Sequence, residues 1–194
     1  MKRKKMMGTP DISVLESELA RAKYRSRYRR VLRSTIYALI TVAAVAVLVA
    51  TLWLPVLQIY GNSMTPSLHE GEIVLSLKTS EFSSGDIVGF YYGNKLLVKR
   101  CIAGPGDIVD IDREGNVYIN DEPLNEPYVS EKAFGECDIS LPYQVPDEKW
   151  FLMGDHRGTS VDSRSTLVGC VAKEQLVGKI VFRVWPLSKF GKIE

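Results

Sequence analysis

The sequence predicts a mainly antiparallel, all-β domain preceded by a single transmembrane helix. Residues 35–54 form an apolar segment of twenty residues without a charge, which is long enough to cross the roughly 30 Å hydrocarbon core of a bilayer. After residue 60, short runs rich in Val, Ile, Phe and Tyr alternate with Gly and Pro turns, and no long helical periodicity follows. With 194 residues, 45% of them hydrophobic and 25% charged, the composition is that of a globular protein.

Charge is distributed unevenly along the chain. Residues 1–33 hold eleven Lys and Arg side chains against three acidic ones, residues 34–60 hold none of either sign, and the remainder is net acidic. Basic segments next to a membrane span stay on the cytoplasmic side. We therefore predict a basic cytoplasmic segment over residues 1–34, a transmembrane helix over 35–54 and an extracytoplasmic domain over 55–194, in a single-pass protein of the plasma membrane.

The N-terminal part has two further interpretations. Ala44-Val45-Ala46 fits the small-x-small pattern of a cleaved signal peptide, although the apolar region of such peptides usually spans about 7 to 15 residues. The basic stretch fits contact with anionic lipid, and nucleic-acid binding is not needed to explain it. Ser13 and Glu16 have capping-box spacing and predict a short cytoplasmic helix, and Pro55 is expected to end or kink the membrane helix.

Seven short runs after residue 60 are interpreted as strands because they are rich in β-branched and aromatic residues. They are residues 72–77, 86–92, 96–102, 108–111, 116–119, 150–153 and 180–185. Gly93-Asn94 and Arg113-Glu114-Gly115 supply hairpin turns. Four prolines between residues 120 and 148 predict an irregular excursion or a small subdomain there.

The cysteines and histidines do not form a metal-binding pattern. Cys101, Cys137 and Cys170 lie in the part expected to be external, where disulfides are permitted, and their odd number leaves at least one unpaired. His69 and His156 lie far apart, and no CxxC motif accompanies them. We expect neither a metal nor a cofactor.

A serine occupies a tight turn shortly after the predicted membrane helix. The segment 61–68 reads Gly-Asn-Ser-Met-Thr-Pro-Ser-Leu, and Ser63 stands at its third position. Such a turn can present a hydroxyl to a substrate, but serines in Gly/Pro turns more often bond the nearby backbone. Taken alone, this segment is more typical of a turn.

A serine nucleophile needs a base, and without a histidine in a recognisable triad arrangement a lysine is the most economical choice. In the run 96–102, a period of two places Lys99 beside Leu97 and Cys101 and places Arg100 on the other face. Burial lowers the pKa of an amine, and neutrality near pH 7 requires a fall of about 3 pKa units from roughly 10.4. A Lys-Arg pair on a solvated edge strand is the alternative.

A polar loop follows the predicted strand 150–153. Residues 154–164 combine glycines, hydroxyls and opposite charges. Ser160 could exchange a hydrogen bond with a catalytic amine, and an Asp162–Arg164 pair could fix the loop. An ordinary polar turn is the alternative interpretation.

Together these segments resemble type I signal peptidases, membrane-anchored proteases that remove signal peptides from secreted proteins. The resemblance covers most of the chain from Trp53 onward. Four boxes occur in the expected order: Ser63-Met64-x-Pro66-x-Leu68, Gly85-Asp86-Ile87-Val88, Lys99-Arg100 followed by Pro105-Gly106-Asp107, and Gly154-Asp155 with Ser160-x-Asp162-Ser163-Arg164.

The resemblance implies a Ser63 nucleophile and a Lys99 general base, with Ser160 orienting the lysine. It also implies that a set of supporting residues surrounds this dyad: Arg100, Gly154, Asp155, Asp162 and Arg164. The oxyanion region is expected at Gly61, Asn62 and Ser63, where the Ser63 N–H donates and Gly61 lacks the hydroxyl that some members use.

The resemblance further implies a fold shared with self-cleaving repressors and an apolar surface against the bilayer, to which Met64 and Leu68 contribute. The expected partners are the lipid bilayer and signal-peptide-bearing preproteins, cut after small residues at the first and third positions before the cleavage site. No nucleic acid is expected, and the protein is expected to be monomeric. His156, Gly158 and Thr159 depart from the family pattern, which leaves substrate preference open, and His156 could add a pH dependence.

Two other functions remain open at this point. One is a catalytically silent or specialised homologue that binds exported or pilus-type subunits. The other is a membrane scaffold whose external domain only binds. The presence of both Ser63 and Lys99 favours the peptidase.

Overall fold

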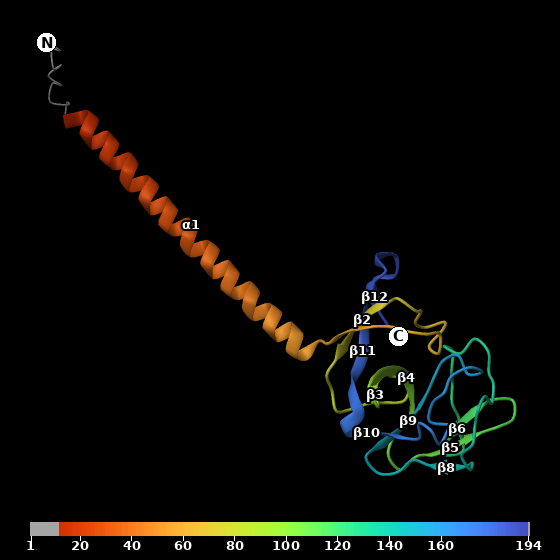
Figure 1. The fold of residues 1–194 in the computed structure, drawn as a ribbon. Coiled ribbons are helices and arrows are strands. Elements are labelled where there is room, and N and C mark those ends of the chain that lie inside the picture. Colours follow the sequence, from red (N-terminus) through yellow and green to blue (C-terminus); the bar gives the residue numbers. More distant parts are fainter. Residues whose placement is uncertain (1–11, 194) are drawn as a thin grey trace. The chain divides into compact units, whose positions relative to one another are not determined.

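The computed structural model describes residues 12–193 (Figure 1). The first eleven residues, which include part of the predicted basic segment, lie outside this range. The chain divides into two compact units, with the boundary between Val49 and Ala50. Among residues 12–193, the first unit contains helix only, and the second contains the end of that helix and the strands.

Helix α1 (Ile12–Trp53) is one uninterrupted helix of 42 residues. It joins the predicted cytoplasmic helix and the predicted membrane helix into one element, because neither Gly nor Pro occurs between Ile12 and Leu54. The helix ends two residues before Pro55, in agreement with the expected stop. Within residues 12–193, α1 is the one helix long and apolar enough to cross a membrane, and its apolar side chains are exposed along residues 36–52.

The larger sheet has the strand order β1-β2-β11-β3-β4-β9-β10, with β12 paired to β11. Every neighbouring pair is antiparallel. Its strands are β1 (Val56–Gln58), β2 (Ile73–Leu77), β3 (Ile87–Tyr92), β4 (Lys95–Ala103), β9 (Lys149–Met153), β10 (Val171–Ala172), β11 (Leu176–Trp185) and β12 (Gly191–Lys192).

A smaller sheet has the order β7-β6-β5-β8. Its strands are β5 (Ile108–Ile111), β6 (Val117–Ile119), β7 (Glu122–Pro123) and β8 (Tyr143–Gln144). Two short 3-10 helices, η1 (Lys173–Gln175) and η2 (Leu187–Lys189), flank β11. Between β7 and β8 the chain is irregular, as the prolines of this segment predict.

The predicted fold class is confirmed, because the domain after α1 is built from antiparallel strands. Each of the seven predicted strands is present, and Gly93-Asn94 forms a two-residue hairpin between β3 and β4, where Tyr92 pairs with Lys95. The strands that the sequence did not predict, β1, β7, β8, β10 and β12, have only two or three residues each. Such short segments carry too little periodicity to be recognised.

Strand β4 is central to the domain and is buried on both faces in its second half. Lys99 and Arg100 are 4% and 2% exposed, and the three residues that follow are also buried. This burial rules out the alternative in which Lys99 and Arg100 lie on a solvated edge strand. The first half of β4 pairs with β3 only, because the pairing of β4 with β9 begins at Arg100. Residues 95–98 therefore present one unpaired edge.

Candidate active site

Ser63 lies in the turn between β1 and β2. Within this turn the N–H of Thr65 donates to Asn62 O at 3.1 Å and the N–H of Leu68 donates to Met64 O at 2.8 Å. Gly61 opens the turn with a φ of +76°, a value that residues with a Cβ rarely adopt. Ser63 itself is partly exposed, so its hydroxyl remains accessible.

Met64 and Leu68 anchor the turn to the core. They are 2% and 0% exposed and pack in a cluster with Leu57, Ile59 and Val74. The prediction that these two side chains contribute to a surface lying against the bilayer is therefore wrong. Apolar side chains in a turn can either pack in the core or form an exposed patch. In this turn both side chains are buried in the core, which removes their apolar surface from water.

Ser63 and Lys99 line the same cavity, which has a volume of about 490 Å³. Its walls come from β1 with the residues that follow it and from the unpaired half of β4. The apolar lining includes Leu57, Ile59, Met64, Leu96 and Val98. The cavity is thus an apolar cleft with a hydroxyl and an amine in its wall.

The Lys99 amine is almost fully buried, and its Nζ donates a hydrogen bond to Ser160 Oγ at 2.7 Å. Desolvation lowers the pKa of Lys99 from 10.5 to about 8; the charge of Asp162 opposes this shift and that of Arg164 adds to it. Across the described residues, this is the one hydrogen bond of the Lys99 amine, and none connects it directly with Ser63. A buried amine with a pKa this low is neutral in a useful fraction of molecules near neutral pH.

Gly154, directly after β9, lets the polar loop approach both Ser63 and Lys99. A Cβ at this position would collide with Ser160 Oγ and would lie 2.5 Å from Ser63 O. The N–H of His156 donates to the same Ser63 carbonyl oxygen at 3.1 Å. The loop predicted to brace the site therefore contacts Ser63 through one residue and Lys99 through another.

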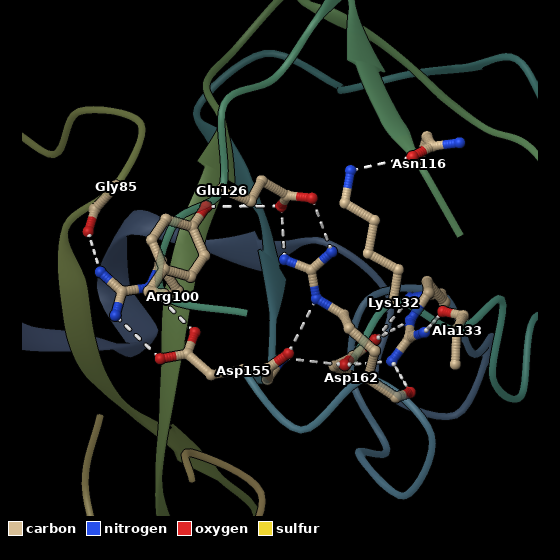
Figure 2. A network of polar contacts seen from close by, with 12 residues as sticks. Gly85, Arg100, Asn116, Glu126, Lys132, Ala133, Asp155 and Asp162 are labelled. Atoms are coloured by element: carbon tan, nitrogen blue, oxygen red, sulfur yellow. Dashed lines mark hydrogen bonds and ion pairs between the residues drawn. The ribbon is translucent and has the colours of Figure 1, made fainter. Parts of the chain in front are cut away.

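Two buried charge pairs lie behind this loop, of which the sequence predicted the second. Arg100 binds Asp155 through Nε at 2.9 Å and Nη2 at 2.8 Å, and the expected Asp162–Arg164 pair is present at 2.9 Å. Asp162 also accepts the N–H of Gly154 at 3.0 Å. Figure 2 shows Arg100 against Asp155, and Asp162 within the same polar network.

Sequence reasoning did not pair Arg100 with Asp155, and it missed a third buried pair, Glu126 with Arg157. The Arg157 guanidinium makes two hydrogen bonds to the Glu126 carboxylate, at 3.1 and 2.5 Å, and its Nε donates to Gly154 O at 3.1 Å. Tyr128 stacks on Arg100 with 3.8 Å from Cζ to the ring centroid, and its hydroxyl donates to Glu126 at 3.4 Å. In Figure 2, Glu126 lies in the same polar network as Arg100 and Asp155.

The three cysteines are unpaired. Cys101 is fully buried, and burial raises the pKa of its thiol to about 12. The sequence required one unpaired cysteine at least, and the structure leaves all three without a disulfide.

Most of the chain is similar to known peptidases. The profile described as "Signal peptidase, peptidase S26" matches residues 32–185, which defines a peptidase of the S26 class. Signal peptidase I of Bacillus licheniformis is 35% identical over 170 residues, covering 81% of this chain and 90% of that protein. Signal peptidase I S of Bacillus subtilis (strain 168) is 37% identical over 144 residues, covering 68% and 77%. The chain belongs to the signal peptidase I family.

A crystal structure of a signal peptidase I from Enterococcus faecalis V583 aligns with a TM-score of 0.43 and 25% identity, covering 51% of this chain and 96% of that one. Membership of the family supports signal-peptide removal as the activity. Together with the apolar helix α1, it also supports a membrane-anchored protein.

Proposed function

We propose that this protein removes N-terminal signal peptides from exported proteins at the outer face of the membrane, with Ser63 as the nucleophile and Lys99 as its base. One observation carries the proposal. Lys99, buried and with its pKa lowered to about 8, shares an apolar cavity with a serine held in a rigid turn. This combination supplies what a serine nucleophile needs, a neutral base within a desolvated site.

In this mechanism neutral Lys99 accepts the proton of Ser63 Oγ as that oxygen attacks the scissile carbonyl. The resulting ammonium group protonates the departing amine, and the new N-terminus leaves with the mature protein. Lys99 then takes a proton from a water molecule that attacks the ester, which returns the hydroxyl to Ser63 and releases the signal peptide. Ser160 holds the amine throughout, because its Oγ accepts a hydrogen bond from Nζ.

The backbone N–H of Ser63 is the proposed oxyanion donor. Within residues 12–193 this N–H has no protein acceptor, whereas the N–H groups of Thr65 and Leu68 are used inside the turn. A free donor beside the attacking oxygen suits the charge that develops on the carbonyl oxygen. Arg100, Asp155, Asp162 and Arg164 hold the surrounding loops, and Gly154 leaves the space that Ser160 needs.

The substrate is proposed to bind as an extended strand in the apolar cleft. The cleft lies between β1, whose outer edge is unpaired, and the unpaired half of β4. An extended peptide adds its backbone hydrogen bonds to such edges. Because alternate side chains of a strand point the same way, the residues at the first and third positions before the cut both face the apolar wall.

The membrane contact is assigned to side chains other than Met64 and Leu68. Exposed apolar residues gather where β11 ends, with Trp185 at 51%, Leu187 at 69% and Phe190 at 59% exposure. We propose that these side chains contact the bilayer. The basic residues before the apolar part of α1 favour a cytoplasmic N-terminus. The protein is proposed to act as a monomer, with signal-peptide-bearing preproteins as its partners.

The experiment compares the intact protein with Ser63→Ala in detergent or lipid, with a signal-peptide-bearing precursor as substrate and mass spectrometry of the product termini. Cleavage by the intact protein alone, after a small-x-small site, is the expected result. Equal cleavage by both would exclude Ser63 as the nucleophile. If neither folded protein cuts, the chain is a binding homologue or is restricted to other substrates.

A further inference from the structure

Ser67, four residues after Ser63, is bound by two arginines from different strands. Arg183 of β11 donates from Nη2 to the Ser67 carbonyl oxygen at 2.6 Å. Arg100 of β4 donates from Nη2 to Ser67 Oγ at 3.0 Å. Both oxygen atoms of Ser67, Oγ and the carbonyl oxygen, are therefore bound by side chains from outside the turn that carries Ser63.

Arg183 is itself held by Glu72, the residue just before β2. Its Nε lies 2.8 Å from Glu72 Oε2, and the two side chains are 15% and 4% exposed. Lys189 and His69 approach the other carboxylate oxygen at 3.5 and 3.6 Å, and both are about half exposed. The contact between Nε and Oε2 is an ion pair without hydrogen-bond geometry. A buried carboxylate requires a close counter-charge, and this attraction keeps Arg183 beside Ser67.

Glu72 also holds the other end of the same segment through its backbone. The N–H of Ile59 donates to Glu72 O at 2.9 Å, and the N–H of Gly71 donates back to Ile59 O at 2.9 Å. The segment 59–67 is thus attached to Glu72 at both ends, directly at Ile59 and through Arg183 at Ser67. Ser63 lies in the middle of this closed segment.

We propose that Arg183, held by Glu72, is a positioning residue that fixes the nucleophile turn; this rests on the proposed role of Ser63. Neither Glu72 nor Ser67 nor Arg183 lines the cavity. The three residues consequently act on the place of the Ser63 hydroxyl and not on the binding of the peptide. The predicted signature is a loss of kcat at constant KM.

The test uses the full-length protein in detergent and compares it with Arg183→Met by two measurements. Hydrogen exchange of the peptides that cover residues 59–71 measures how readily the turn opens, and this measurement does not depend on activity. The expected result is faster exchange in these peptides alone. In cleavage of a precursor, kcat is expected to fall about 100-fold with KM unchanged, since a shift of about 1 Å in a reacting group has an effect of this size.

Two further variants separate positioning from general destabilisation. Lys179→Met removes another ion pair of β11, with Asp86 at 2.5 Å, which has no contact with the turn, and is expected to leave both measurements unchanged. Arg183→Lys keeps a charge for Glu72 but has no fork to reach Ser67 at the same time, so an intermediate kcat is expected. It also serves as the test variant if Arg183→Met does not fold.

Normal exchange in residues 59–71 of a folded Arg183 variant would overturn the inference, whatever the activity. Wild-type kcat in that variant would overturn it too. These results differ from failure of the proposed function, in which the wild-type protein itself does not cleave or Ser63→Ala cleaves equally well. In that case the exchange measurement alone decides whether Arg183 fixes the turn.

Discussion

Lys99 in the wall of the cavity and the three arginines of the network behind it are all buried basic side chains, yet their partners differ. Arg100, Arg157 and Arg164 are each at most 2% exposed, and each faces a carboxylate. Lys99 is equally buried, but its amine has a single hydrogen bond to a neutral hydroxyl. Equal burial thus gives three permanent charges and one amine whose pKa is lowered to about 8.

The two kinds of group differ in intrinsic basicity as well as in their partners, so burial affects their protonation differently. A guanidinium stays charged and needs a carboxylate, whereas an amine left without one releases its proton more easily. The network holds the loop in place, and the cavity contains the proposed base. Variants of the cavity and variants of the arginine network test this difference separately.

The largest effect is expected for Lys99→Met, which replaces the amine by an apolar side chain of similar length. Cleavage of a precursor should fall by about 10⁴-fold or more, because the variant removes the buried amine that is proposed to accept the Ser63 proton. The measurement is the single-turnover rate of the purified full-length variant. Retained hydrolysis would remove Lys99 from the mechanism.

The same variant is expected to fold more stably than the wild type at pH 7. The folded-state pKa of Lys99, about 8, lies below the ordinary 10.5, so the folded protein resists protonation, and wild-type stability rises as the pH increases from 8 to 10.5. The advantage of Lys99→Met should reach at most about 3 kcal/mol below pH 8 and disappear near pH 10.5. Urea unfolding at both pH values checks this, and a less stable variant at pH 7 would contradict it.

In the arginine network, Arg157→Met leaves the Glu126 carboxylate buried without its charged partner. A loss of about 3 to 5 kcal/mol in the free energy of unfolding is expected, measured by urea unfolding. The double variant Arg157→Met/Glu126→Leu removes both charges and should recover most of this loss. If the single and double variants are equally destabilised, the ion pair is not what holds the loop.

A smaller effect is the pH dependence of cleavage. Because neutral Lys99 is the active form, kcat/KM should fall about tenfold for each pH unit below about 8 and level off above it. Asp162 raises the pKa of Lys99, so in Asp162→Asn the midpoint should move to lower pH. A pH-rate profile from pH 5.5 to 9.5 tests both, and a flat profile would exclude Lys99 as the titrating base.

The smallest effect is expected for Tyr128→Leu, which removes the ring from Arg100 but leaves the Arg100–Asp155 pair. A cation–π contact at a partly buried site is worth about 1 kcal/mol, so the free energy of unfolding should decrease by this amount while kcat stays within about twofold. Tyr128→Phe keeps the ring and is the matched control. Equal losses in both would assign the effect to the hydroxyl.

The parts that the sequence predicted are those with local signals. Strand β4 shows its two faces in a run of nine residues, and Asp162 lies two positions from Arg164. The partners of Arg157 and Arg183 had no such signal, because Glu126 is 31 residues away and Ser67 is 116 residues away. Only the folded topology brings these groups together, and Met64 and Leu68 were misjudged because an apolar side chain does not reveal which neighbour covers it.

The absence of a disulfide among Cys101, Cys137 and Cys170 has a practical and a biological consequence. The domain that follows α1 reaches its folded shape without a thiol oxidase. Changes in the ambient glutathione balance should leave the enzyme unaffected. Production in a reducing cell-free system should yield the same folded protein as secretion into an oxidising compartment.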